Sequence, residues 1–131
     1  MPTRGSNASD FSILVVDDDA ELRDSLTEEL RSFDFKTYSA ESVGDALLVL
    51  YGNRVDIILS DVRMPQVSGL DFLKMVDPFN PGGPKVVLMT GSKDVTFEQA
   101  AKFGASMLLH KPLDRHFLLD SLWKVLIPKA S

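Results

Sequence analysis

The chain has 131 residues, 44% apolar and 25% charged, which is typical of one globular domain large enough to bury a core. Its net charge of −5, with no cluster of Lys and Arg, argues against direct binding of nucleic acid. The lack of Cys, of a signal-like N-terminus and of an apolar run near the roughly 18 residues of a membrane helix predicts a cytoplasmic protein with no disulfide and no membrane partner.

The predicted elements alternate between short apolar segments and amphipathic stretches. Residues 1–10 are small and polar and are expected to form a disordered tail, followed by one folded domain at 11–128 and a short tail at 129–131. In chain order, the patterns predict a strand at 13–16, a helix at 22–33 that Asp19 caps, a strand at 35–38, a helix at 43–50, a strand at 55–59, a helix at 70–76 that Pro78 ends, a strand at 86–89, a weak helix at 97–103, a strand at 107–110, and a helix at 117–126 that Asp114 caps and Pro128 ends.

This order of elements predicts the fold class. Four of the five strand segments are nearly continuous in apolar residues, which is typical of strands buried on both faces of a parallel sheet. Strands that alternate with helices indicate right-handed crossovers and therefore a doubly wound α/β fold, a five-stranded parallel sheet with helices on both faces. Such sheets bind ligands outside the carboxyl ends of their strands.

Polar residues follow four of the predicted strands, at the point where each strand ends. The four segments are Asp17-Asp18-Asp19, Ser60-Asp61, Thr90-Gly91-Ser92 and His110-Lys111-Pro112. Because the carboxyl ends of parallel strands lie at one edge of the sheet, we expect these segments to converge. The sequence therefore predicts a rim that holds three carboxylates, a hydroxyl and an ammonium group.

The three carboxylates are those of Asp17, Asp18 and Asp61. An ionised pair about 4 Å apart repels by on the order of 4 kcal/mol at an effective dielectric constant near 20, so a raised pKa or a bound cation must offset the repulsion. Oxygen ligands without His or Cys favour a hard ion, and Mg²⁺ fits because it keeps waters and phosphate oxygens beside few protein ligands. With Lys111 and the Thr90 hydroxyl, the set contains what phosphoryl transfer to an aspartate requires.

Each rim residue also has an ordinary structural explanation when it is considered alone. The run from Asp17 to Asp19 could cap the following helix and favour its positive end. Asp61 could be a turn residue before Pro65, Thr90 a helix cap, and Lys111 a solvated loop residue. Their coincidence at four strand ends favours one shared site.

These motifs resemble those of the response-regulator receiver family of two-component signalling, over about Ser12 to Leu126. The segments that carry the resemblance are residues 13–19 (ILVVDDD), residues 56–65 (DIILSDVRMP) with Gly69, residues 87–91 (VLMTG), Gly104-Ala105 and Lys111-Pro112. No one segment is specific, but their combination in this order is. The resemblance implies a flavodoxin-like fold with strand order 2-1-3-4-5.

The resemblance also implies roles for the acidic residues. Asp61 would be the phosphoacceptor and a ligand of Mg²⁺. Asp17 and Asp18 would hold the same ion, one directly and the other directly or through water. The backbone carbonyl of Arg63 would complete the metal contacts of the protein.

The remaining rim residues would bind the phosphoryl group. Thr90, followed by Gly91, would contact a phosphoryl oxygen after the switch, and Lys111 would pair with the group. The Lys111-Pro112 bond is often cis in this family, which would aim the lysine inward. A histidine kinase or histidine phosphotransfer protein would supply the phosphoryl group. A downstream effector protein, a fused output domain or a second copy in a homodimer would respond to it.

Three features depart from the family pattern. Leu108 stands three residues before the lysine, where Tyr or Phe is usual, so the usual aromatic rotamer switch cannot operate as such. Gly91 follows Thr90 where Ala is also common, which would open the site to water or a small phosphodonor. The segment from Thr90 to Gly104 is about one residue shorter than usual, which predicts a short fourth helix.

Two other functions are alternatives to phosphoryl acceptance. One is a receiver-fold interaction or dimerisation module whose signalling is largely independent of phosphorylation, which Leu108 motivates. The other is a Mg²⁺-dependent phosphatase of the aspartyl-phosphate kind, but such enzymes usually need a second acid two residues after the nucleophile, where this chain has Arg63, and a lid domain. We therefore expect no enzyme activity beyond self-phosphotransfer and autodephosphorylation.

Overall fold

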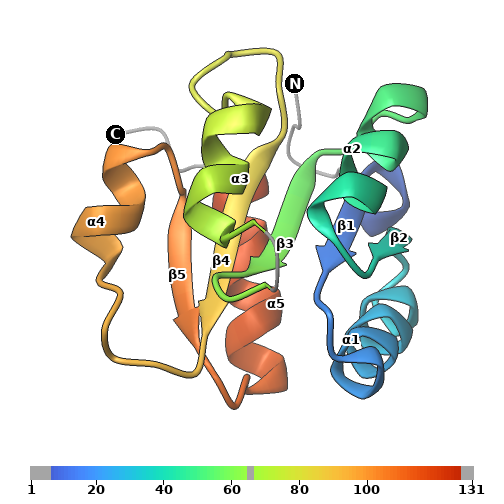
Figure 1. The fold of residues 1–131 in the computed structure, drawn as a ribbon. Coiled ribbons are helices and arrows are strands. Elements are labelled where there is room, and N and C mark those ends of the chain that lie inside the picture. The colour runs from blue at the N-terminus through green and yellow to red at the C-terminus, as the bar shows by residue number, and fades with distance from the viewer. Residues whose placement is uncertain (1–6, 65–66, 128–131) are drawn as a thin grey trace.

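The computed structural model describes residues 7–64 and 67–127. A parallel sheet forms its centre, with the strand order β2-β1-β3-β4-β5 (Figure 1). The strands are β1 (Ser12–Val16), β2 (Lys36–Ala40), β3 (Ile57–Asp61), β4 (Lys85–Thr90) and β5 (Met107–His110). The predicted fold class and strand order are therefore confirmed.

Helices connect the strands: α1 (Ala20–Ser32), α2 (Val43–Gly52), α3 (Gly69–Val76), α4 (Phe97–Lys102) and α5 (Arg115–Leu126). The predicted caps are confirmed, because Asp19 accepts hydrogen bonds from two backbone N–H groups at the start of α1 and Asp114 does the same for α5. As expected, α4 is short, and the Thr96 side chain caps it. In the two described ranges, no helix combines the length and the apolar character needed to cross a membrane.

The sheet is buried on both faces because alternate strand residues point to different helices. Ile13 and Val15 of β1 pack with side chains of α1 and α5, whereas Leu14 and Val16 pack with side chains of α2, α3 and α4. β3 and β4 follow the same alternation. The edge strand β2 is only partly buried, which explains why its sequence is the least apolar of the five.

The described part of the predicted N-terminal tail contains a helical turn. Ala8–Asp10 form a short 3-10 helix in which the Asn7 backbone N–H donates to the Asp10 carboxylate at 3.0 Å. Ala8 packs against the core cluster beneath α1 and α5. An apolar contact and local hydrogen bonds therefore place this turn against the domain, and the extent of the N-terminal tail stays a prediction. Residues 1–6 and 128–131, which include the rest of both predicted tails and Pro128, lie outside the described residues.

Some residues of the predicted core stripes are exposed instead. Leu47 of α2, Phe97 of α4 and Phe117 of α5 all belong to such stripes, yet all three are exposed. These helices carry apolar side chains on more than one face, so the helical spacing alone does not determine which face meets the sheet.

Candidate functional site

The four polar strand ends lie at one edge of the sheet. β1 and β3 pair so that Val16 lies opposite Ser60, and Asp17 and Asp61 follow side by side. β4 and β5 pair so that Thr90 lies opposite His110, which places Lys111 beside the end of β4. The register of the parallel sheet thus assembles residues that are far apart in the sequence.

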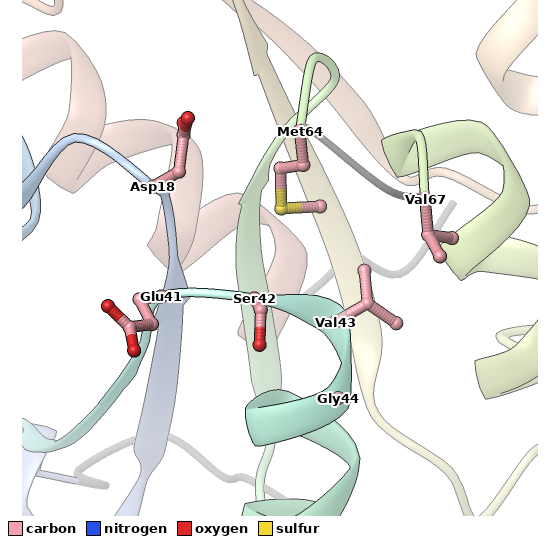
Figure 2. Close-up of a pocket in the computed structure, with 7 residues that line it drawn as sticks. All are labelled: Asp18, Glu41, Ser42, Val43, Gly44, Met64 and Val67. Atoms are coloured by element: carbon pink, nitrogen blue, oxygen red, sulfur yellow. The ribbon is translucent and has the colours of Figure 1, made fainter.

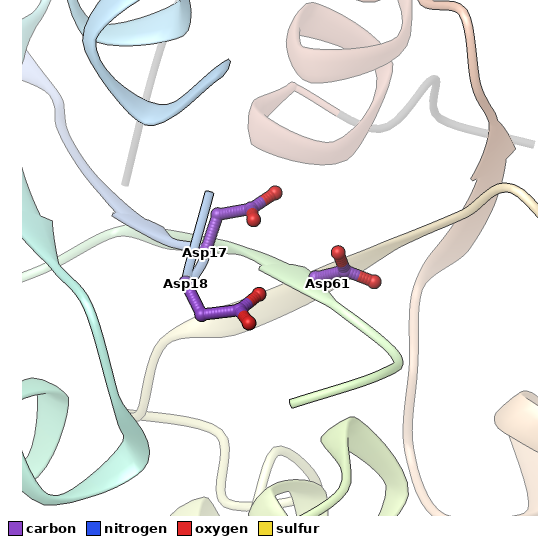
Figure 3. Close-up of side chains that lie close together, drawn as sticks. All are labelled: Asp17, Asp18 and Asp61. Carbon is purple, nitrogen blue, oxygen red and sulfur yellow. The ribbon is translucent and has the colours of Figure 1, made fainter. Parts of the chain in front are cut away.

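Three carboxylates gather at this edge, as Figure 3 shows. One oxygen atom from each of Asp17, Asp18 and Asp61 lies within 4.8 Å of the other two. Asp17 is fully buried, Asp61 is nearly so, and Asp18 is exposed, so the cluster is open to solvent on the side of Asp18. An all-oxygen donor set with an open side fits a hard divalent cation that keeps some of its waters, as Mg²⁺ does.

Lys111 provides the positive charge within the cluster. Its Nζ lies 2.7 Å from Oδ2 of Asp61 and 3.3 Å from Oδ2 of Asp17. Its backbone N–H donates to the carbonyl of Thr90 at 2.8 Å, and the Lys111-Pro112 peptide bond is cis, as the family resemblance implied. One ammonium group contacts two of the three carboxylates, so the ionised cluster has an excess of negative charge.

Burial controls the protonation of Asp17. Burial raises the pKa of this carboxyl above its usual value of 3.8, although the Asp19 N–H and Lys111 oppose the shift, while the Asp61 charge adds to it. For Lys111, burial acts to lower the pKa, but the hydrogen bond to Asp61 and the charges of both carboxylates outweigh it and raise the pKa above 10.5. A carboxylate that is disfavoured by burial is one that a bound cation would stabilise.

Backbone donors hold the two buried carboxylates in place. The Arg63 N–H donates to Oδ1 of Asp61 at 3.0 Å, and the Asp19 N–H donates to Oδ1 of Asp17 at 2.9 Å. The Arg23 guanidinium also donates to the Asp17 carbonyl at 2.7 Å. These bonds fix the carboxylate orientations without neutralising their charge. The role of the Arg63 carbonyl as a metal ligand stays a prediction.

The end of β4 forms a small hydroxyl-containing loop. The Thr90 hydroxyl accepts a hydrogen bond from the Ser92 N–H at 3.0 Å, so it is engaged within its own loop. Gly91 is exposed, and a Cβ atom built there meets no heavy atom within 4 Å. An alanine at this position would therefore fit without strain, and the glycine leaves this side of the loop open.

The contacts of the Arg63 side chain were missed by the sequence reasoning. Its Nη2 lies 3.2 Å from the Ser92 hydroxyl and 3.1 Å from the Asp94 carboxylate, so it joins the loop after β3 to the loop after β4. Both charged side chains are largely exposed, which limits the stability that the pair contributes. Residues 63 and 94 belong to separate loops, and no sequence spacing connects them.

Gly69 has a steric role that the resemblance did not specify. A Cβ atom at this position would lie 2.7 Å from the Asp61 carbonyl oxygen and 2.8 Å from Cα of Val62. The Gly69 N–H donates to the Val62 carbonyl at 2.7 Å. The start of α3 therefore packs directly on the backbone that carries Asp61, and only glycine permits this approach.

A pocket of about 400 Å³ opens beside the cluster (Figure 2). Asp18, Glu41 and Ser42 line one part of it, and Val43, Met64 and Val67 line another. The pocket thus extends the open side of the carboxylate cluster between the loops that follow β1, β2 and β3. Residues 65–66, including the Pro65 of the predicted motif, lie outside the described residues.

Leu108 lies on β5, where it pairs with Leu88 of β4. It is half-buried and packs against the core cluster beneath α2, α3 and α4. An aliphatic side chain thus occupies the position at which the family usually has an aromatic ring.

The chain is similar to known proteins. The family model of the response regulator receiver domain matches residues 13–122. The transcriptional regulatory protein ZraR of Salmonella typhimurium is 37% identical over 116 residues, which are 88% of this chain and 26% of that protein. The response regulator protein PilR of Pseudomonas aeruginosa is 35% identical over 102 residues, which are 77% of this chain and 23% of that protein. The chain thus spans about a quarter of the length of these curated relatives.

Solved structures give the same result. A response regulator receiver domain protein from Clostridium thermocellum superposes with a TM-score of 0.81 at 26% identity, over 88% of this chain and 94% of that chain. The chemotaxis protein CheY4 of Vibrio cholerae superposes with a TM-score of 0.79 at 28% identity, over 88% of this chain and 98% of that chain. With the family match over most of its length, the chain belongs to the response regulator receiver domain family.

Proposed function

We propose that this receiver domain accepts a phosphoryl group on Asp61 from a phosphohistidine of a histidine kinase or a histidine phosphotransfer protein. The observation that supports the proposal is the contact of Asp61 with both Lys111 and the carboxylates of Asp17 and Asp18. Phosphorylation on an aspartate and Mg²⁺ binding at an acidic pocket are typical of receiver domains, which are signalling domains rather than enzymes. Asp17, Asp18, Asp61 and the Arg63 carbonyl would hold the Mg²⁺ ion.

The transfer exchanges one bond to phosphorus for another. A carboxylate oxygen of Asp61 attacks the phosphorus, the P–N bond of the phosphohistidine breaks, and the imidazole leaves and takes its proton from solvent. Bound Mg²⁺ would neutralise charge on the phosphoryl oxygens. Lys111 offers an ammonium group at the same place, already 2.7 Å from Asp61. The Arg63 and Asp19 N–H groups hold the buried carboxylates in position.

The acyl phosphate adds a charge of about −1.5 to −2 at neutral pH. The Thr90 hydroxyl, which now accepts from Ser92, would turn to donate to a phosphoryl oxygen, and Lys111 would pair with the new group. The loops after β3 and β4 would shift together, since Arg63 joins them. An effector protein or a fused output domain that prefers this state tenfold needs only about 1.4 kcal/mol of differential affinity.

A second function is favoured by one observation, the half-buried aliphatic side chain of Leu108. Without an aromatic ring that can change its position, the domain would signal through contacts that are largely independent of phosphorylation. Beryllofluoride mimics the phosphoryl group, so an effector whose affinity is unchanged by beryllofluoride would support this second function. A change in affinity would exclude it.

Labelling of Asp61 tests the phosphoacceptor role. The protein is incubated with Mg²⁺ and acetyl phosphate and its intact mass is measured. The wild type and the exposed control variant Asp120→Asn should gain one phosphoryl group, whereas Asp61→Asn should gain none. Omission of Mg²⁺ should prevent the gain in every variant. Equal labelling of the wild type and Asp61→Asn would exclude Asp61 as the acceptor.

A further inference from the structure

The outer face of α2 is apolar but uncovered. Six consecutive residues from Ala46 to Tyr51 are apolar, and the helix has a single charged residue, Asp45. Only part of this apolar surface meets the sheet, because Leu48 is 73% exposed and Tyr51 is 94% exposed. A helix that is apolar around most of its circumference is normally covered on both sides.

A groove lies next to these exposed side chains. It has a volume of about 430 Å³ and runs between the C-terminal halves of α2 and α3 and the segment before β4. Leu47, Tyr51, Met75, Val76 and Pro84 are among its lining residues, and Met75 is itself 54% exposed. One molecule therefore presents both a protruding tyrosine and an apolar hollow beside it.

The groove is remote from the candidate phosphorylation site. The helices run opposite to the strands they follow, so the C-terminal ends of α2 and α3 lie at the sheet edge away from Asp61 (Figure 1). None of the groove-lining residues belongs to the carboxylate cluster. What binds at this face can therefore bind in either phosphorylation state.

Two pairs of opposite charges lie near the groove. The Arg54 guanidinium lies 3.5 Å from Asp56, and the Lys74 ammonium lies 3.8 Å from Asp71. The face is therefore close to electrically neutral, although the chain carries a net charge of −5. Two copies could approach through this face with little like-charge repulsion, because each of these exposed charges has an opposite charge beside it.

We propose that the face formed by α2 and α3 binds a second copy of this chain about a two-fold axis, with Tyr51 of each copy inserted into the groove of the other. A two-fold interface uses the same surface on both copies and requires that surface to be self-complementary, which a knob beside a hollow satisfies. The exposed parts of Leu47, Leu48, Tyr51 and Met75 amount to roughly 500–600 Å² per copy, so two copies would bury roughly 1,000–1,200 Å², which is at the small end for a specific interface.

The same area sets the strength of the association. Interfaces at the small end of the range are transient, so we expect a dimer that forms at micromolar concentration. A buried tyrosine at the centre of an interface is a frequent hot spot.

Sedimentation equilibrium of the whole chain tests the dimer. The wild type should show a concentration-dependent mass between monomer and dimer, up to about 500 µM. The double variant with Leu48→Glu and Tyr51→Glu should weaken the association at least tenfold and keep the wild-type circular dichroism, because both altered side chains are exposed. Phe117→Glu is the matched control, since Phe117 is a 56% exposed aromatic residue on α5. It should leave the association unchanged.

Cross-linking provides a second measurement. The chain has no Cys, so Tyr51→Cys creates a unique thiol that a short bismaleimide should join between two copies, whereas Phe117→Cys should not cross-link. Asp61→Asn should still form the dimer, so the dimer can be tested independently of the phosphoacceptor role of Asp61. A wild type that stays monomeric throughout, or a dimer that Phe117→Glu disrupts and the α2 variants do not, would overturn the proposal. In the first case the face would belong to a different protein domain.

Discussion

Replacement of Asp17 by Asn should stabilise the protein when no divalent cation is present. Asp17 is 0% exposed, and burial raises the pKa of its carboxyl, so the ionised form is unfavourable in the folded state. The asparagine keeps the size of the side chain and an oxygen that can accept from the Asp19 N–H, which now lies 2.9 Å from Oδ1. The asparagine NH2 group would stand where Oδ2 now accepts from Lys111 Nζ at 3.3 Å, so the substitution removes the charge and this one hydrogen bond.

The distances give the size of the effect. Repulsion between Asp17 and Asp61, whose oxygens lie within 4.8 Å, is at least about 3.5 kcal/mol at an effective dielectric constant of 20. Attraction between Asp17 and Lys111 at 3.3 Å stabilises the ionised form by about 5 kcal/mol at the same dielectric constant. Desolvation of a buried carboxylate adds a penalty of several kcal/mol, so the balance is unfavourable by roughly 1–3 kcal/mol. Lys111 keeps its closer partner Asp61 at 2.7 Å in the variant.

Thermal unfolding in EDTA measures this difference. The Asp17→Asn variant should unfold about 3–15 °C above the wild type at neutral pH, since 1 kcal/mol shifts the Tm of a domain of this size by about 3–5 °C. Because the folded-state pKa of Asp17 is raised, its protonated form favours folding. The wild type therefore loses stability as the pH rises from 3.8 through that raised pKa. The advantage of the variant should accordingly shrink at acidic pH.

Mg²⁺ should reverse the order of the two proteins. A ligand at 100 times its Kd stabilises the folded state by about 2.7 kcal/mol, and the wild type should gain this amount while Asp17→Asn gains little. Asp120→Asn makes the same change in net charge at an exposed position on α5 and should behave like the wild type. A lower Tm for Asp17→Asn than for both other proteins in EDTA would refute the reasoning, because the buried charge would then be stabilising.

Three further substitutions test other parts of the site. Lys111→Met should lower the free energy of unfolding by about 1–3 kcal/mol in EDTA, because two buried carboxylates lose their counter-charge, and Mg²⁺ should restore most of it in urea titrations; an unchanged midpoint would contradict this. Gly69→Ala should lower the Tm and slow labelling of Asp61, because a Cβ atom at residue 69 would meet backbone atoms closer than 3 Å. Gly91→Ala should keep the wild-type Tm, because a Cβ atom at residue 91 meets no heavy atom within 4 Å. An equal loss of Tm in both variants would contradict the packing of Gly69 on the Asp61 backbone. Asp19→Ala should lower stability by about 1 kcal/mol through loss of the α1 cap, with Mg²⁺ affinity retained in calorimetric titration; a loss of Mg²⁺ binding would make Asp19 part of the metal site.

The sequence alone determined the elements and their order. Apolar runs such as residues 13–16 and 86–89 predicted buried strands, and helical spacing with Asp19 and Asp114 as caps predicted α1 and α5. These signals are local, because burial on both faces of a strand requires continuous apolar residues and a helix start requires a side-chain acceptor. The alternation of strands and helices then placed four polar segments at one sheet edge, since parallel strands end on the same side.

Tertiary structure decided the burial and the contacts of each residue. Asp17 and Asp18 are neighbours in the sequence, yet the first is fully buried and the second exposed, because successive residues after β1 point in different directions. The contact of Arg63 with Asp94 and the close approach of Gly69 to Asp61 join segments that share no sequence spacing. The exposure of Leu48 and Tyr51 also depended on the fold: α2 is apolar on several faces, and only its packing against the sheet selected the face that is buried.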